Sequence, residues 1–273
     1  MKHLIILFFL MSFLSGFSQN VEVSELVIGE VLTFDSEILG EERELNIYLP
    51  QTYESGSDSY PVIYLLDGTL SEDFIHIAGL TQFGSFPWVK LNPECIVVGI
   101  SNIDRTKDFS FPTNNEEDLK NFPTSGKSAS FISYLKDEVK PMVESKYRIN
   151  KSSTLIGQSM GGLLATEILF KNPDLFDNYI IVSPSLWWDD QSLLEIEPKP
   201  FEGKKKIYIT VGKEGKEMVD VSNELYNKVK AYKNEDTQTF YRYEGALNHA
   251  NILHQAVYNA FEKIFKEKQT EMK

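Results

Sequence analysis

The segment Thr154–Ala165 reads Thr-Leu-Ile-Gly-Gln-Ser-Met-Gly-Gly-Leu-Leu-Ala, and the rest of the chain can be interpreted around it. The apolar run before its first glycine predicts a strand, and the apolar residues after its last glycine predict a helix. Between them, Gly157, Ser159 and Gly161 form the pattern Gly-x-Ser-x-Gly, which in this context is typical of a nucleophile elbow. The tight turn needs small residues beside the serine, and it places the hydroxyl at a helix N-terminus that favours developing negative charge. The pattern predicts that Ser159 is a nucleophile.

The first eighteen residues have the composition of an export signal. Lys2 supplies a positive charge, Leu4–Phe13 form an apolar core, and Gly16–Ser18 form a small-x-small cleavage pattern. The apolar core is shorter than the roughly 20 residues of a transmembrane helix. We therefore expect residues 1–18 to be a signal peptide and residues 19–273 to form one exported α/β domain without a membrane span. Export without disulfides favours a bacterial protein, periplasmic or secreted.

The composition limits the classes of partner. The formal net charge of −13 at pH 7 argues against binding to nucleic acid or to an anionic membrane. The single cysteine, Cys95, lies in an apolar run and is expected to be a buried side chain without an internal disulfide partner. No repeat or composition break divides the chain.

Apolar runs alternate with helical patterns along the chain. Strands are expected at 31–37, 44–49, 60–66, 94–100, before Ser159, and at 178–182, 206–211 and 237–243. Helices are expected at 70–83, at 125–147 with an interruption at Pro141, after Ser159, and at 219–232 and 252–265. The polar segment 101–124 is expected to be a long, functional loop. About eight strands in a mostly parallel sheet flanked by helices, with the elbow after the fifth strand, fit the α/β-hydrolase fold.

A nucleophilic serine needs a base, and in this fold the order along the chain is serine, acid, histidine. After the signal segment the histidines are His76, His249 and His254. His76 precedes the serine, so it does not fit this order. His254 lies within the predicted last helix, five residues after His249. At that spacing the two side chains diverge, so they are not expected to bind a zinc ion together. His249 follows the last strand and is the expected base.

The acid is expected in the turn after the strand 206–211. Glu214 is nearest to the end of that strand, and Glu217 and Asp220 are alternatives. All three could instead be acids in the first turn of a helix, where the helix dipole favours negative charge. A catalytic dyad of serine and histidine without a close acid is a further alternative.

Two backbone N–H groups are needed to stabilise an oxyanion. One is expected from Met160, the residue after the nucleophile, and the other from the turn at Gly68 and Thr69 after the third strand. Acyl transfer of this kind requires no metal and no organic cofactor.

Five segments together resemble the esterase D-like branch of the α/β-hydrolases, and the resemblance covers nearly the whole chain after the signal. The segments are Pro61–Gly68, Gly99–Phe109, Gly157–Gly162, Ser183–Trp188 and Asn248-His249. The resemblance implies ester hydrolysis by Ser159 and His249. Two stretches look most like the siderophore-esterase subgroup: Ser-Pro-Ser-Leu-Trp-Trp at Ser183–Trp188 and Asp-Arg-Thr-Lys-Asp at Asp104–Asp108. That subgroup hydrolyses the trilactone of enterobactin-type catecholates. One departure is Gln158, where many relatives carry histidine.

The substrate side is less well defined by the sequence. Arg105 is expected either to hold an anionic or catecholate group or to pair with Asp104 or Asp108. Of Trp187 and Trp188, one is expected in the core and one at the substrate. The substrate is expected to be a small-molecule or saccharide-linked ester. Alternatives are a feruloyl or acetylxylan esterase, an acyltransferase, and a non-catalytic binding protein on the same fold.

Overall fold

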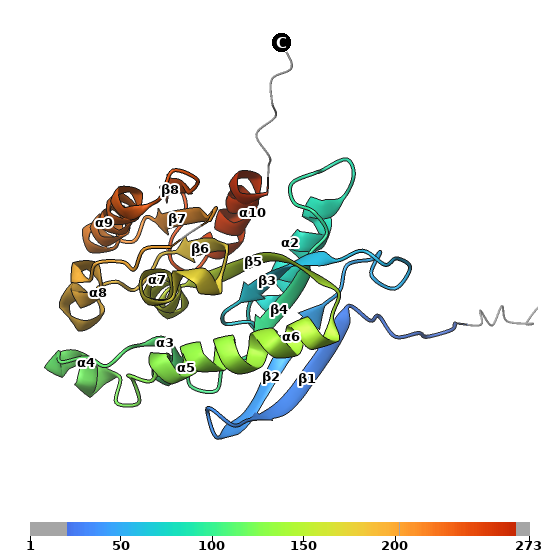
Figure 1. The fold of residues 1–273 in the computed structure, drawn as a ribbon, viewed down its shortest axis with the longest axis horizontal. Helices are drawn as coiled ribbons and strands as arrows, with labels where there is room; N and C mark the ends of the chain where they lie inside the picture. Colours follow the sequence, from blue (N-terminus) through green and yellow to red (C-terminus); the bar gives the residue numbers. More distant parts are fainter. Residues whose placement is uncertain (1–20, 202, 266–273) are drawn as a thin grey trace, which may run out of the picture.

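The computed structural model describes residues 21–201 and 203–265, so the predicted signal peptide lies outside the described residues. One eight-stranded sheet runs through the centre, in the order β1-β2-β4-β3-β5-β6-β7-β8 (Figure 1). Its strands are β1 (Gly29–Ser36), β2 (Glu41–Tyr48), β3 (Tyr60–Leu65), β4 (Ile96–Ile100), β5 (Ile149–Gln158), β6 (Asn178–Val182), β7 (Lys206–Gly212) and β8 (Gln238–Glu244).

The first two strands differ from the rest in direction. β1 pairs antiparallel with β2, and β2 pairs antiparallel with β4, whereas all the other neighbours are parallel. Every residue of β3, β4 and β6 is buried, because helices cover both faces of the parallel part. This order, with a sharp turn after the fifth strand, is the α/β-hydrolase fold, as the sequence predicted.

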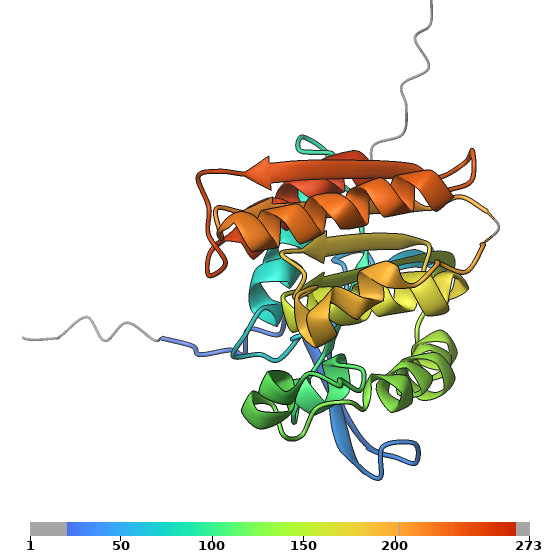
Figure 2. The ribbon, with the colours of Figure 1, turned by 90° about the vertical axis from the view of Figure 1, so that its left-hand side faces the viewer.

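Helices cover the two faces of the sheet unequally. α2 (Phe74–Ser85) and α10 (Ile252–Ile264) pack on one face, and the remaining long helices pack on the other (Figure 1). Figure 2 shows α9 (Lys216–Tyr232) lying along β7 and β8. The other helices are α3 (Arg105–Phe109), α4 (Glu116–Asn121), α5 (Ser128–Tyr134), α6 (Lys140–Lys146), α7 (Met160–Lys171), α8 (Ser192–Glu195) and α9 (Lys216–Tyr232).

Two short helical turns and a buried cysteine complete the description of the fold. Short 3₁₀ turns lie at Pro173–Leu175 and Trp188–Gln191. Cys95 is fully buried, as predicted. Within the described part of the chain, no helix has both the length and the apolar character needed to cross a membrane.

The predicted helix 125–147 is interrupted, as expected from its proline. α5 continues into a π-helical turn, Leu135–Val139, before α6 begins at Lys140. Pro141 has no N–H to donate and its ring crowds the preceding turn, so the backbone widens there. The apolar face is kept: Phe131, Leu135 and Val143 are all buried.

The segment 101–124 is not a plain loop, which corrects the prediction from its polar composition. It contains α3 and α4, each capped by a side chain at its start. The Asp104 carboxylate accepts from the N–H of Lys107, and the Asn115 side chain accepts from the N–H groups of Glu117 and Asp118. Helices this short show no clear hydrophobic period, so they could not be predicted from the sequence pattern.

A stacked pair of histidines joins the two helices on the α2 face. The rings of His76 on α2 and His254 on α10 lie 3.3 Å apart between centroids and 2° from parallel. His254 Nε2 also lies 3.4 Å from Asp73 Oδ1. Burial and the nearby His254 lower the pKa of His76 from its ordinary value.

This pair predicts a loss of stability in mild acid. Because the pKa of His76 is lower in the folded state, the unfolded state binds more protons as the pH falls below about 6.5, and folding is disfavoured. We expect the urea-unfolding free energy of His76→Gln to fall less than that of the unaltered protein between about pH 7.5 and about pH 5.5. Identical pH profiles for the two proteins would contradict this role.

Candidate active site

The predicted elbow has strained backbone geometry. Ser159 stands between β5 and α7 with φ 59° and ψ −120°, a conformation that non-glycine residues rarely adopt. A Cβ on Gly157 would lie 2.3 Å from the carbonyl oxygen of Gly161, so a larger residue cannot fit there. A Cβ on Gly162 would lie 2.9 Å from Pro184 Cα, so this glycine allows the segment after β6 to approach the elbow.

The structure brings one carboxylate to His249. Glu214 Oε2 lies 2.6 Å from His249 Nδ1, and Glu214 Oε1 accepts from Ser183 Oγ at 2.6 Å and from the N–H of Gly212 at 3.0 Å. Burial raises the pKa of Glu214, but the hydrogen bonds from His249, Ser183 and Gly212 outweigh it, and the net pKa is lowered. An ionised carboxylate at this distance orients the imidazole and leaves its other nitrogen, Nε2, for the reaction.

The two alternative acids do not reach the histidine. Glu217 and Asp220 both lie on α9 with exposed side chains. Asp220 forms an ion pair with Lys216, one helical turn away. The turn after β7 points Glu214 inward and leaves the other two carboxylates facing solvent.

Ser159 and His249 line two adjoining hollows of the surface. One, of about 490 Å³, is also lined by Trp187, Glu214 and Met218. The other, of about 420 Å³, is also lined by Asp67, Arg105 and Gln158, among others. The Ser159 hydroxyl lies 3.3 Å from Ser185 Oγ, and among the described residues it makes no hydrogen bond to His249. Such a bond between nucleophile and base often tightens only when substrate binds.

The oxyanion expectation is corrected at one position. The N–H of Gly68 donates to the carbonyl of Ile100 at 3.0 Å, so it is not available to an oxyanion. Over the residues that the structure describes, the N–H of Thr69 has no hydrogen-bond acceptor, and Met160 begins α7, where N–H groups lack an intrahelical acceptor. The candidate donors are therefore Met160 and Thr69.

The two tryptophans have different environments. Trp188 is fully buried, and its Nε1–H donates to the carbonyl of Phe111 at 2.9 Å, so it cannot contact a substrate. Trp188 is therefore the core tryptophan of the pair and is not a substrate residue. Trp187 is half-buried and lines the hollow that also contains Ser159.

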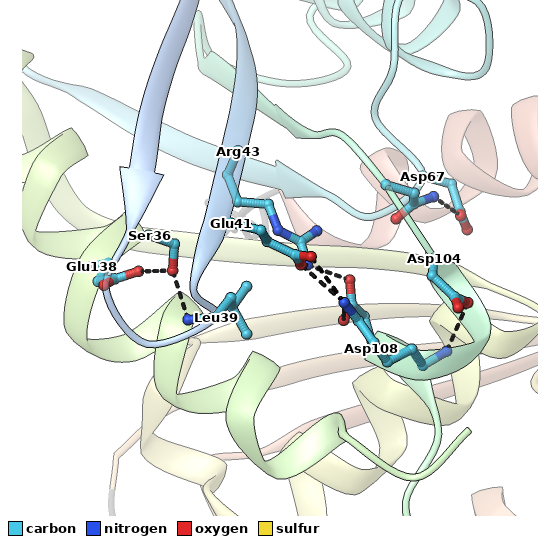
Figure 3. Close-up of polar contacts among 10 residues, drawn as sticks. Ser36, Leu39, Glu41, Arg43, Asp67, Asp104, Asp108 and Glu138 are labelled. Carbon is cyan, nitrogen blue, oxygen red and sulfur yellow. Dashed lines mark hydrogen bonds and ion pairs between the residues drawn. The ribbon is translucent and has the colours of Figure 1, made fainter. Parts of the chain in front are cut away.

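The partner of Arg105 differs from both expected ones. Its Nε and Nη2 donate to Asp67 Oδ1 and Oδ2 at 2.8 and 2.9 Å, a bidentate pair with a residue 38 positions earlier. Neither Asp104 nor Asp108 is its partner: Asp104 caps α3, and Asp108 pairs with Arg43 (Figure 3).

Sequence reasoning missed several side chains that support the site. Ser183 and Asp67 are each more than 30 residues away from the group they hold. Both lie in segments quoted for the family resemblance, and both adopt positive φ, at 43° and 56°. Gln158 was singled out only as a departure from relatives, yet its Nε2–H₂ donates to the carbonyl of His249 at 2.5 Å.

The Gln158 contact predicts a positioning effect on the base. Gln158→Met keeps the side-chain length but removes the donor to the loop that carries His249. Loss of one such hydrogen bond is worth about 1 kcal/mol, so we expect kcat for a p-nitrophenyl ester to fall roughly fivefold to tenfold with KM unchanged. Gln158→His, which restores a donor, should recover part of the rate, and an unaltered kcat in Gln158→Met would contradict the effect.

No group of three His, Cys, Asp or Glu side chains in residues 21–201 and 203–265 is arranged to hold a metal ion.

The chain is similar to a group of known esterases. Residues 36–269 match the family described as "Putative esterase". The chain is 29% identical over 217 residues to the ferri-bacillibactin esterase BesA of Bacillus subtilis, covering 71% of this chain and 69% of that one. Similar solved structures are the IroE-like serine hydrolase from Shewanella oneidensis (27% identity, TM-score 0.78, 87% of this chain and 80% of that one) and the BES protein from Bacillus cereus (26%, 0.79, 92% and 100%). The chain belongs to the family of esterases that this match defines.

Proposed function

We propose that the protein is a serine esterase that hydrolyses carboxylic esters through an acyl-enzyme. The observation that carries this proposal is the Glu214–His249 contact of 2.6 Å beside hollows that also open onto Ser159 in a strained elbow. A strained backbone at a serine costs stability, so its presence beside an oriented imidazole favours a catalytic role over a binding protein with an inactive site.

The mechanism follows from these positions. Ser159 Oγ attacks the ester carbonyl while His249 Nε2 takes its proton, and the N–H groups of Met160 and Thr69 hold the oxyanion. The intermediate collapses, the C–O bond to the alcohol breaks, and His249 gives its proton to the leaving alkoxide. Water then attacks the acyl-enzyme by the same path, and His249 returns the proton to Ser159, which releases the carboxylic acid.

We further propose that the substrate is an ester-linked siderophore. The support is the set of relatives: besides the ferri-bacillibactin esterase, a siderophore triacetylfusarinine C esterase of Aspergillus fumigatus is 38% identical over 79 residues, 28% of this chain and 27% of that one. Trp187 and Met218 beside Ser159 give one hollow an aromatic and apolar wall suited to the aromatic ring of a catecholate.

Parallel kinetics with purified protein test the substrate class. We expect kcat/KM for the ferric complex of a catecholate trilactone to exceed that for methyl ferulate and for acetylated xylan by at least about 100-fold, a difference of roughly 3 kcal/mol. A preference for the ferulate or xylan ester would contradict the siderophore as substrate, and the proposed reaction, ester hydrolysis, would still hold. Absence of any ester hydrolysis would contradict the proposed function.

We also propose export, on the basis of the charge and apolar pattern of residues 1–18. Expression of the full chain in a bacterium, followed by fractionation and N-terminal sequencing, tests it. A mature start near Gln19 outside the cytoplasm is expected, and an uncleaved cytoplasmic product would contradict it.

A further inference from the structure

We infer that Lys213 is a specificity-determining residue that binds the negatively charged part of the substrate beside Ser159. The inference rests on the proposed function, since it names the charge that this esterase site recognises. Lys213 follows β7 and lines the hollow of about 490 Å³ together with Ser159 and Trp187. Its side chain therefore belongs to the same surface as the reacting groups.

The charge of Lys213 is not used by the fold. Within the part of the chain that the structure describes, its ammonium group has no ion-pair, hydrogen-bond or ring partner, whereas Lys216 nearby pairs with Asp220. The backbone of Lys213 is engaged, since its N–H donates to the carbonyl of Leu247 at 2.7 Å, and its side chain is exposed. A free ammonium on a flexible stem, carried by a fixed backbone, can reach an anionic ligand without breaking a contact of the protein.

The other groups of this hollow suit a flat aromatic anion. Trp187 and Met218 are half-buried and give it an aromatic and apolar wall. The side-chain oxygen of Asn248 accepts from the N–H of Ala250 at 3.0 Å, which leaves its NH₂ group as a donor. A catecholate has an aromatic ring and two negatively charged oxygens, so an aromatic wall, a cation and an amide donor together match its chemistry.

The carboxylate next to Lys213 in sequence does not cancel its charge at the surface. The Glu214 side chain is 5% exposed, and its oxygens are held by His249, Ser183 and the N–H of Gly212. The carboxylate is thus turned inward while the Lys213 side chain faces solvent. The exposed charge on this wall of the hollow is positive.

The adjoining hollow has the opposite charge. It is lined by three carboxylates, Asp67, Glu72 and Asp73, and by one guanidinium, Arg105, which is already paired with Asp67. An anionic group is repelled there and attracted to the Lys213 side, so charge selects which part of the ester enters which hollow. Because the chain has a formal net charge of −13, binding of an anion depends on a local cation of this kind.

The experiment compares one ester scaffold in two charge states. The ferric complex of a catecholate trilactone is a multiply charged anion, because its doubly deprotonated catechols outweigh the charge of the ferric ion. The iron-free trilactone is uncharged near neutral pH. In Lys213→Gln we expect KM for the ferric complex to rise about fivefold to tenfold with kcat within about twofold, since loss of a substrate contact raises KM. KM for the iron-free trilactone and for p-nitrophenyl acetate should change by less than about twofold.

Further variants separate charge from side-chain size. Lys213→Arg should keep the KM of the unaltered protein for the ferric complex within about twofold, and Lys213→Glu should raise it by about 50-fold. Lys216→Gln is the matched control, since Lys216 is an exposed lysine of α9 that lines neither hollow. It should leave KM for every substrate unchanged. Raising NaCl from about 50 mM to about 500 mM should weaken the ferric complex less in Lys213→Gln than in the unaltered protein.

Binding is measured apart from hydrolysis in Ser159→Ala, by quenching of tryptophan fluorescence with the ferric complex. We expect a Kd about fivefold to tenfold higher in Ser159→Ala/Lys213→Gln than in Ser159→Ala. Equal Kd values, no binding of the ferric complex to Ser159→Ala, or an equal rise in KM for p-nitrophenyl acetate would each overturn the inference. Absence of ester hydrolysis by the unaltered protein would instead overturn the proposed function, and the binding titration would still decide the role of Lys213.

Discussion

Replacing Ser159 with alanine lowers kcat for an ester substrate by about 10⁴-fold or more, which is what loss of a triad nucleophile costs in serine hydrolases. The acyl-enzyme route is then closed, and the remaining rate comes from binding and the oxyanion donors acting on water. Because Ser159 is strained at φ 59°, the alanine variant keeps the strain and is expected to unfold at nearly the same temperature. Initial rates with p-nitrophenyl acetate over a range of concentrations give the comparison.

A second serine provides the control for this substitution. Ser145 lies on the exposed side of α6, where its hydroxyl donates to the carbonyl of Met142. Ser145→Ala should retain the kcat of the unaltered protein. Turnover in Ser159→Ala within about tenfold of the unaltered rate would show that another group attacks the ester.

Replacing Glu214 with glutamine lowers kcat by about 10⁴-fold, the size of the loss when the acid of such a triad becomes an amide. The substitution preserves size but removes the charge beside His249 Nδ1, so the imidazole loses its orientation and the stabilisation of its protonated form. In this variant the Ser183 hydroxyl and the Gly212 N–H either donate to the one remaining side-chain oxygen or lose their acceptor. Loss of the acceptor also lowers the stability of the folded protein. Steady-state kinetics on the p-nitrophenyl ester measure the loss.

The neighbouring acids make this prediction selective. Glu217→Gln and Asp220→Asn alter exposed carboxylates on α9 that do not contact His249, and both should keep kcat within about twofold. A larger loss in either of these than in Glu214→Gln would return the acid assignment to the alternatives that the sequence left open.

The fold could be predicted from sequence because its strands are buried on both faces. Such strands read as near-continuous apolar runs, as in β3 and β4, and the glycines of the elbow identify the turn after β5. Expecting His249 as the base was possible because histidine is scarce in this chain. Its catalytic role, like that of Ser159, stays a prediction until the variants are measured.

The remaining site residues depend on tertiary contacts that local pattern does not encode. Three carboxylates follow β7 within nine residues, and only the direction of the turn selects Glu214. Adjacent tryptophans are indistinguishable in sequence, although one fills the core and the other faces the hollow. The N–H of Gly68 is occupied because β4 lies beside β3, and Arg105 finds Asp67 for the same reason. Neighbour order in a sheet is a property of the whole chain.

Mass spectrometry of the covalent adduct with a fluorophosphonate tests the central claim most directly. The protein is treated with a fluorophosphonate, digested, and the modified peptide is sequenced, with Ser159→Ala and Glu214→Gln treated in parallel. The expected result is one stoichiometric adduct on Ser159, none in Ser159→Ala, and markedly slower labelling in Glu214→Gln. An adduct on a different residue, or no adduct on a protein that still hydrolyses esters, would contradict Ser159 as the nucleophile.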